Sequence, residues 1–266
     1  MPSRDRWRSK FQIKEGTWVF VPTDETIAKG YRIKKRIENV WDSPDIFYHL
    51  KKGGHVKALQ HHLGNKYFLR LDIKDFFGHI NRSRITRSLK NHLSYTEARE
   101  IAMESSVRLP GSSDSKYILP FGFVQSPIIA SLCFSKSAFF GKLSSLCKDG
   151  FALSVYVDDI ILSHNDCDKL NKQMSSLKDA SERSGFPLND KKQEGPGECI
   201  TAFNVFLKQG EMRIIPEKLD EFRNVYQNSE NECQRAGIES YVNSINSSQA
   251  EFLYSPTTGR VSQERF

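Results

Sequence analysis

Two adjacent acids, Asp158 and Asp159, constrain the fold of this chain most strongly because apolar, β-branched runs surround them. Residues 151–157 precede them and residues 160–162 follow, which predicts a tight β-hairpin with the acids at its bend. An open strand would point the two carboxylates to opposite faces, whereas a turn can hold at least one at the sheet surface. Paired acids are costly unless cations offset them, and an oxygen-rich site of this kind suits Mg²⁺. The plainer alternative is a hairpin with a solvated Asp pair at its tip.

The composition is that of a globular protein with a basic surface. The chain has 266 residues, enough for one large domain or two small ones, and 39 Lys and Arg against 32 Asp and Glu. The surplus of +7 favours a polyanionic partner, although lysine-rich surfaces also serve solubility. Five widely spaced cysteines without a CxxC pair indicate neither a disulfide framework nor a zinc site. Without an apolar leader or a bilayer-length apolar stretch, we expect a cytoplasmic protein with no membrane association.

A third acid, Asp72, lies near the end of a predicted strand over residues 66–73. Thr23 is a predicted N-cap for an earlier helix, and Ser126 with Pro127 predicts the start of a helix that runs to about Cys147. Gly185 predicts the end of a helix that begins near Asn165. The last forty residues are polar and predict either a small helical appendage or partial disorder.

The predicted elements follow a recognisable order once the insertions are set aside. They are strand 66–73, a helix, strands 151–157 and 160–163, helix 166–184 and strand 199–207, the βαββαβ order of a ferredoxin-like fold. In that fold Asp72 can meet the acids of the hairpin on a neighbouring strand. Three acids converging on one sheet of a basic protein suggest phosphoryl transfer with two metal ions about 3.5–4 Å apart.

Several segments then resemble the motifs of reverse transcriptases. Residues 68–77 (Phe-Leu-Arg-Leu-Asp-Ile-Lys-Asp-Phe-Phe) resemble motif A, and residues 119–127 (Leu-Pro-Phe-Gly-Phe-Val-Gln-Ser-Pro) resemble motif B. Tyr-Val-Asp-Asp at 156–159 matches motif C, and residues 185–192 (Gly-Phe-Pro-Leu-Asn-Asp-Lys-Lys) resemble motif D. Residues 200–205 are similar to the motif E region of retron-type enzymes. The motifs occur in the family's order.

The resemblance spans about residues 25–225 and implies a bacterial reverse transcriptase of the retron or defence-associated type, which includes abortive-infection and unknown groups. Residues 53–62 are also similar to the region before motif A in those enzymes. It implies an α+β polymerase right-hand fold with a ferredoxin-like palm, helical fingers and a small thumb. The implied boundaries are 1–65 for an N-terminal extension and fingers, 66–208 for the palm with inserted fingers helices, and 209–266 for the motif E hairpin, thumb and tail.

The resemblance also implies a metal site. Asp72 and Asp158 would be the main ligands of two Mg²⁺ ions, with Asp159 beside them and the carbonyl of Ile73 contributing; Mn²⁺ is an alternative ion. Lys192, or else Lys191, would be the motif D lysine that protonates the leaving pyrophosphate. The plainer alternative for that lysine is a solvated loop residue.

The implied nucleotide-binding residues are Phe77, Phe121, Gly122 and Gln125. Phe77 falls at the steric-gate position that rejects a 2′-hydroxyl, or is a core phenylalanine. The chain departs from the family at Phe121, where Gln is usual, and at Gln125, where Gly or Ala is usual. This departure affects how the sugar and the templating pair are held.

The fingers cations that grip the triphosphate have no strong match in the sequence. The N-terminal cations lie among aromatic residues, and such an arm can lie along nucleic acid or be a frayed terminus. Gly53 and Gly54, beside two lysines, can let a backbone approach a phosphate closely, or belong to an ordinary turn. The cations that we name as nucleic-acid contacts are Arg4, Arg6, Arg8, Lys34, Lys35, Lys51 and Lys52.

The expected activity is RNA-directed DNA synthesis from a 3′-hydroxyl with deoxynucleotides. The resemblance implies a structured non-coding RNA partner, a DNA product, antiphage defence and a protein effector as a further partner. One alternative is template-independent or protein-primed synthesis by the same site. Another is a non-catalytic palm that binds RNA and scaffolds a partner, although the three intact acids argue against it.

Overall fold

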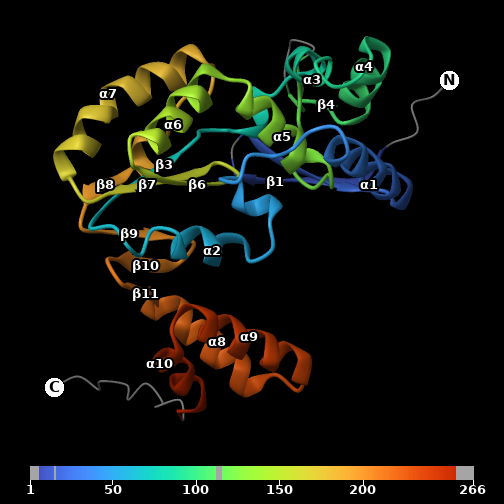
Figure 1. Cartoon of the computed structure of the whole chain (residues 1–266). Coiled ribbons are helices and arrows are strands. Elements are labelled where there is room, and N and C mark those ends of the chain that lie inside the picture. Colours follow the sequence, from blue (N-terminus) through green and yellow to red (C-terminus); the bar gives the residue numbers. More distant parts are fainter. Residues whose placement is uncertain (1–5, 15, 112–115, 256–266) are drawn as a thin grey trace.

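A four-stranded antiparallel sheet lies at the centre of the molecule. The computed structural model describes residues 6–14, 16–111 and 116–255. The strands stand in the order β6 (Ala152–Tyr156), β7 (Asp159–His164), β3 (Tyr67–Asp72) and β8 (Glu194–Gly197). Together with the helices between them, this order is the ferredoxin-like arrangement that the sequence predicts, in a mixed α+β fold (Figure 1).

The fourth strand is not the predicted one. Strand β8 pairs with β3, whereas residues 199–207, predicted as one strand, form most of two: β9 (Cys199–Ala202) and β10 (Val205–Lys208). Between them Phe203 and Asn204 both adopt positive φ, 56° and 61°. Two consecutive left-handed residues reverse the chain as a tight hairpin, so the single strand was a wrong prediction. Strand β11 (Glu211–Ile214) then pairs with β10 to complete a three-stranded meander.

The two faces of the central sheet contact different hydrophobic cores. On β3, Leu69 and Leu71 belong to the larger core, while Phe68 belongs to a second one, as strand alternation requires. The larger core is covered by α5 (Ser126–Ser135), α6 (Ala138–Lys148) and α7 (Cys167–Arg183). Strands β9 to β11 and helix α2 (Gly54–Gln60) lie on the opposite side (Figure 1).

The helix predicted from Ser126 to about Cys147 is two helices. It breaks between α5 and α6 because the Ser137 side chain accepts a hydrogen bond from Phe140 N, which caps a new helix. Ser126 is the first residue of α5 rather than its N-cap, and its hydroxyl donates to the Pro120 carbonyl over 2.7 Å. The proline after it occupies the first turn as predicted.

The N-terminal segment pairs with its neighbour in the structure. Strands β1 (Trp7–Lys14) and β2 (Thr17–Pro22) form an antiparallel hairpin, so the described part of this arm is neither frayed nor extended alone. Thr23 then caps α1 (Asp24–Glu38) by accepting from Thr26 N over 3.2 Å, as predicted.

The remaining elements surround this frame. Between β3 and α5 lie α3 (Arg82–Leu89), α4 (Tyr95–Glu104), β4 (Val107–Arg108) and β5 (Tyr117–Ile118). After β11 come α8 (Pro216–Asn228), α9 (Glu232–Ile245) and α10 (Ser247–Ala250), so the described C-terminal part is the helical appendage. Short 3₁₀ turns span Tyr48–Leu50, Phe77–His79, Asp190–Lys192 and Glu251–Tyr254. None of the helices described combines the length and the apolar character needed to cross a bilayer.

Candidate active site

The three aspartates converge at one end of the central sheet. Asp72 and Asp159 are direct cross-strand partners on β3 and β7, so both side chains leave the same face. The backbone of Asp158 joins them because Ile73 N donates to the Asp158 carbonyl over 2.9 Å. The structure therefore brings together acids that lie almost ninety residues apart in the chain.

The bend that carries Asp158 is held by a histidine that the sequence analysis missed. Val157 has a φ of 57°, which is rare for a β-branched residue. Its N–H donates to His49 Nδ1 over 3.0 Å, and His49 Nε2 lies 2.7 Å from Ser131 Oγ. Because Nδ1 accepts, the ring proton resides on Nε2, which donates to the serine. Burial lowers the pKa of His49 to about 4, which keeps the ring neutral.

Two cations and an amide hold the carboxylates in place. Arg70 donates to Asp159 Oδ1 from Nε and Nη2, over 2.9 and 2.7 Å. Lys192 Nζ lies 2.7 Å from Asp72 Oδ2, and Asn189 Nδ2 donates to Asp72 Oδ1 over 3.2 Å. Arg70 lies two residues before Asp72 on the same strand, so strand alternation was the signal that could have placed it on this face.

The cluster holds more negative charge than its surroundings readily accommodate. Burial, followed by repulsion from Asp159, raises the pKa of Asp158 to about 6. Burial also raises the pKa of Asp159 although Arg70 opposes the shift. The hydrogen bond to Asp72 raises the pKa of Lys192, which therefore stays protonated at neutral pH. A further cation at this place would stabilise the ionised carboxylates.

The chemistry of these donors fits a hard divalent cation. Carboxylate oxygens are the ligands that Mg²⁺ and Mn²⁺ prefer. In the described residues no three His, Cys, Asp or Glu side chains are arranged to hold a metal ion. Lys192 and Arg70 instead occupy oxygens of Asp72 and Asp159. The Lys192 side chain is 47% exposed and flexible, so it can turn away when a cation binds.

Three of the residues predicted to hold the nucleotide, Phe77, Phe121 and Gly122, form a cluster that we call the wall. Phe77 is only 6% exposed, and its ring centroid lies 4.6 Å from that of Phe121 in an edge-on contact. Phe121 accepts a hydrogen bond from Phe20 N over 3.0 Å, which joins the wall to β2. Gly122 has a φ of +100°, and a Cβ there would lie 2.3 Å from the Phe20 carbonyl oxygen. The wall and the N-terminal hairpin thus meet backbone to backbone.

Gln125 does not lie on an accessible surface. It is 1% exposed, and its Nε2 donates to Ser105 Oγ over 3.2 Å. A Cβ added at Gly30 would lie 2.6 Å from its Oε1, so the amide fills the space beside α1. In this conformation the side chain packs between α1 and the end of α4, and its role as a nucleotide contact stays a prediction.

Most of the cations named from the sequence already have partners within the chain. Arg6 donates to three backbone carbonyls at the end of α4, over 2.7 to 2.9 Å, so it anchors the N-terminal hairpin. Lys51 lies 2.6 Å from Asp45 Oδ1. Arg8 pairs with Asp24, and Lys34 lies 3.8 Å from Glu38. Lys35 and Lys52 are exposed, and Arg4 lies outside the described residues.

The chain matches one protein family and is similar to several solved structures. The chain matches the family described as "Reverse transcriptase (RNA-dependent DNA polymerase)" over residues 28–253. Among solved structures it is similar to telomerase from Candida albicans in complex with a TWJ fragment of telomeric RNA, at 11% identity and a TM-score of 0.49. A foamy viral protease-reverse transcriptase in complex with double-stranded DNA matches at 16% identity and a TM-score of 0.48.

The two alignments cover 86% and 87% of this chain but only 46% and 35% of those structures. The chain therefore spans less than half of the length of either protein. Proteins with reverse transcriptase domains use divalent metal ions, which agrees with the donor chemistry at the end of β3. The family match covers most of the sequence, and it includes all three aspartates. This chain belongs to the reverse transcriptase family.

Proposed function

We propose that this protein is an RNA-directed DNA polymerase that adds deoxynucleotides to a 3′-hydroxyl. The observation that carries the proposal is the cross-strand pair of Asp72 and Asp159 with Asp158 at the adjoining bend. These side chains would hold two divalent ions, Mg²⁺ or Mn²⁺, with the Ile73 carbonyl beside them. The bound ions would act as Lewis acids toward the phosphate and the attacking hydroxyl.

The chain's own residues would prepare and finish the reaction. Arg70 fixes the orientation of Asp159, and His49 fixes the bend before Asp158. Lys192, whose pKa is raised by Asp72, would carry the proton for the leaving pyrophosphate once it turns from that carboxylate. Phe77 would limit the space at the sugar, with Phe121 and Gly122 behind it.

We assign the parts of the hand as follows. Residues 1–65 would be an N-terminal extension and fingers, 66–208 the palm with inserted fingers helices, and 209–266 a motif E hairpin, thumb and tail. In support, all four strands of the central sheet fall within 66–208, and α8 to α10 fall within 209–266.

The partners would be an RNA template, deoxynucleotides and a DNA product. The motif resemblance supports a retron-like bacterial enzyme that works in the cytoplasm with a structured non-coding RNA and a protein effector in antiphage defence. The basic surface, with a formal net charge of +7, favours such polyanions.

The test of the catalytic role is Asp158→Ala in the full chain. We expect Mg²⁺-dependent incorporation on an RNA template to fall by about a thousandfold or more, because stabilisation of several kcal/mol is lost with a metal ligand. Thermal unfolding and RNA binding should change little. Asp42→Ala, at an exposed acid away from the site, is the matched control. Persisting synthesis by Asp158→Ala would remove this residue from catalysis.

A second candidate function has one specific observation in its favour. Phe121 stands where the family usually has Gln, and it packs against Phe77 instead of offering an amide. This arrangement favours template-independent or protein-primed synthesis by the same site. Sequencing the product made with each single nucleotide separates the two: templated copying requires the complementary nucleotide, whereas untemplated synthesis yields homopolymers. A scaffold without activity would make no product with any nucleotide.

A further inference from the structure

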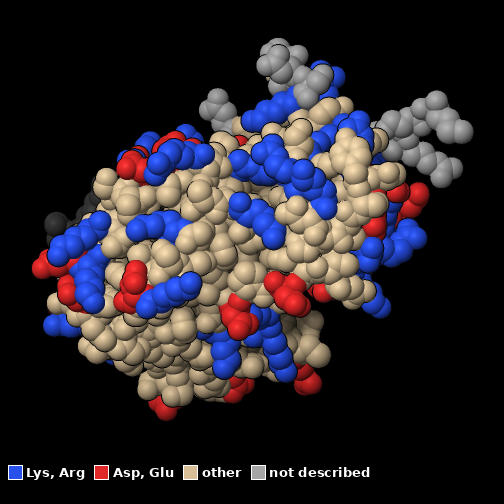
Figure 2. Space-filling model, turned by 45° about the horizontal axis from the view of Figure 1, so that its top comes forward, with Lys and Arg blue, Asp and Glu red and all other residues tan. Residues whose placement is uncertain are grey.

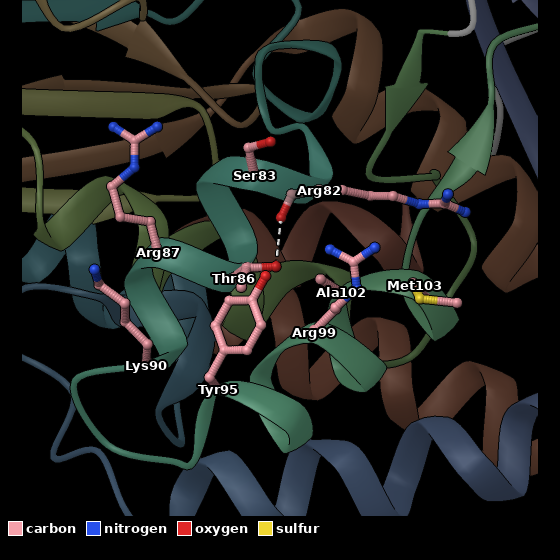
Figure 3. Close-up of a pocket in the computed structure, with 9 residues that line it drawn as sticks. All are labelled: Arg82, Ser83, Thr86, Arg87, Lys90, Tyr95, Arg99, Ala102 and Met103. Atoms are coloured by element: carbon pink, nitrogen blue, oxygen red, sulfur yellow. Dashed lines mark hydrogen bonds between the residues drawn. The ribbon is translucent and has the colours of Figure 1, made fainter.

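A basic groove separates helices α3 and α4. Its cavity is about 450 Å³, and its walls carry four cationic side chains together with exposed Tyr95 (Figure 3). Arg87 and Lys90 project from α3, and Arg99 stands opposite them on α4 (Figure 3). We call this feature the α3–α4 groove, after the helices that line it. Its residues have no part in the proposed reaction.

The charge of the α3–α4 groove is not balanced from within. Its lining residues include no Asp or Glu, and Arg87, Lys90 and Arg99 form no ion pair with any described residue. The neighbouring hollow between α1 and α4 differs, because Arg36 lies 2.7 Å from Glu97 there and Lys29 lies 2.8 Å from Glu104. Unpaired cations concentrated in a hollow raise the local potential and attract anions.

The positive surface continues beyond this groove. Arg87 also lines a second cavity of about 500 Å³ with Arg84, Lys136 and Arg183, whose lining again includes no acid. Figure 2 shows Lys and Arg side chains gathered in a band over this face. Arg84 is held rigidly, since it donates to the Ser184 carbonyl over 2.8 Å and covers the Phe186 ring. Because Arg87 lines both cavities, the positive surface is continuous and suits an extended polyanion rather than one small ion.

This surface lies on the side of the sheet away from the aspartates. Ile85 and Leu89 of α3 are buried in the core that receives Leu69 and Leu71. Asp72 leaves the opposite face of β3. In Figure 1, α3 and α4 accordingly lie on the side where α6 and α7 cover the sheet. A strand bound here would not be the one positioned at the carboxylates.

We propose that the α3–α4 groove binds the phosphate backbone of a single-stranded RNA segment outside the candidate active site, with a base stacked on Tyr95. Arg87, Lys90 and Arg99 would contact phosphates, and the tyrosine ring, 62% exposed, offers the aromatic face that single-strand binders place among cations. The choice of RNA rests on the proposed function, because a polymerase guided by a structured RNA needs to hold segments that it does not copy.

The test uses the full chain and a labelled single-stranded RNA of about twenty nucleotides. The charge-reversal variant R87E/K90E/R99E is compared with K66E/K169E/K172E, which makes the same change in net charge at three exposed lysines near the other end of the sheet. Binding is followed by fluorescence anisotropy over a range of salt concentrations. A second variant, R87Q/K90Q/R99Q, serves if charge reversal impairs folding.

We expect the groove variants to bind the RNA about tenfold or more weakly, with a salt slope shallower by about two because three phosphate contacts each contribute about 0.7. The control variant should stay within about twofold of the wild type. Equal losses in the groove and control variants would overturn the proposal, since total charge would then explain them. Tyr95→Ala should weaken binding about fivefold or more, whereas Tyr95→Phe should not; equal binding by the two would overturn the stacking.

Extension of a short preformed primer–template duplex separates this proposal from the proposed function. We expect the groove variants to extend that duplex as the wild type does, because it is too short to reach the far side of the sheet. If the wild type extends nothing, the polymerase proposal fails, while the binding comparison still decides the groove. A loss of extension that matches the loss of RNA binding would instead place the surface in the catalytic path and overturn its independence.

Discussion

At the scale of single residues, the hydrogen bond between Val157 and His49 stabilises the left-handed backbone of the bend that carries Asp158. The Val157 N–H has one acceptor, His49 Nδ1, at 3.0 Å, and Asp158 follows directly. His49→Phe preserves a ring but removes the acceptor, which should lower the free energy of unfolding by about 1–3 kcal/mol. It should also lower kcat for nucleotide addition by about tenfold while changing KM little, since a misplacement cost of about 1.4 kcal/mol is tenfold in rate.

His49→Asn is the conservative comparison because its Oδ1 can take the place of Nδ1. We expect this variant to recover a large part of kcat. Steady-state kinetics with urea unfolding of both variants would check the assignment, and identical kcat values for Phe and Asn would rule out a positioning role.

His62 provides a prediction about pH at the same scale. It is fully buried, with Nδ1 2.7 Å from Ser163 Oγ and Nε2 2.8 Å from Ser154 Oγ. Burial lowers its pKa from 6.5 to about 3. Because the folded-state pKa is the lower one, its stabilisation is complete above pH 6.5 and is lost as the pH falls. The loss should reach about 2 kcal/mol at pH 5.

His62→Gln should lack this part of the acid sensitivity. Urea unfolding at pH 8 and pH 5 measures it: the wild type should lose about 2 kcal/mol more than the variant between these conditions. The comparison uses the difference between two pH values, so a lower overall stability of the variant does not affect it. Equal losses would show that His62 is not the titrating group.

At the scale of elements, Gly122 decides how the N-terminal hairpin joins the rest of the chain. Its φ is +100°, and a methyl group added there would lie 2.3 Å from the Phe20 carbonyl oxygen, which leaves no room for a side chain. Gly122→Ala should therefore cost more than about 2 kcal/mol and weaken protection from hydrogen exchange in β1 and β2. Gly210→Ala is a matched control, because its φ is +73° but nothing lies within 4 Å of the added methyl.

The Gly210 variant separates the cost of a left-handed backbone from the cost of the steric clash with Phe20. Gly210→Ala should cost only the left-handed penalty, about 1–2 kcal/mol. If both variants lose the same stability and the hairpin keeps its protection, the backbone contact at Phe20 does not set the position of β2.

At the scale of the whole molecule, β3 belongs to both hydrophobic cores. Phe68 and Leu69 are each fully buried but face opposite layers. Truncating either to Ala should cost about 2–5 kcal/mol and lower the same single unfolding transition, because loss of either layer exposes the shared sheet. Denaturant unfolding followed by far-ultraviolet dichroism and by tryptophan fluorescence would detect it. Two separated transitions, each sensitive to one variant, would show that the layers unfold independently.

The sequence by itself determined the features that depend on near neighbours. Thr23 caps α1 and Gly185 ends α7 because a cap needs only a side chain or a positive φ at one position. The aromatic and β-branched content of residues 66–73 placed Asp72 near the end of a strand, and the apolar runs around Asp158 predicted the hairpin. The predicted order of elements was sufficient to expect the acids to converge, since the ferredoxin-like topology has few alternatives.

Only the tertiary structure decided the features that depend on residues far apart. Strand β8, with Gly195 and Pro196, has little intrinsic strand propensity and forms because β3 offers it an unpaired edge. His49 reaches Val157 across 108 positions, and Lys192 reaches Asp72 across 120. Such contacts follow from how the layers pack, and local propensity carries no information about them. For the same reason the burial of Gln125 and the unpaired charge between α3 and α4 emerge only once the chain is folded.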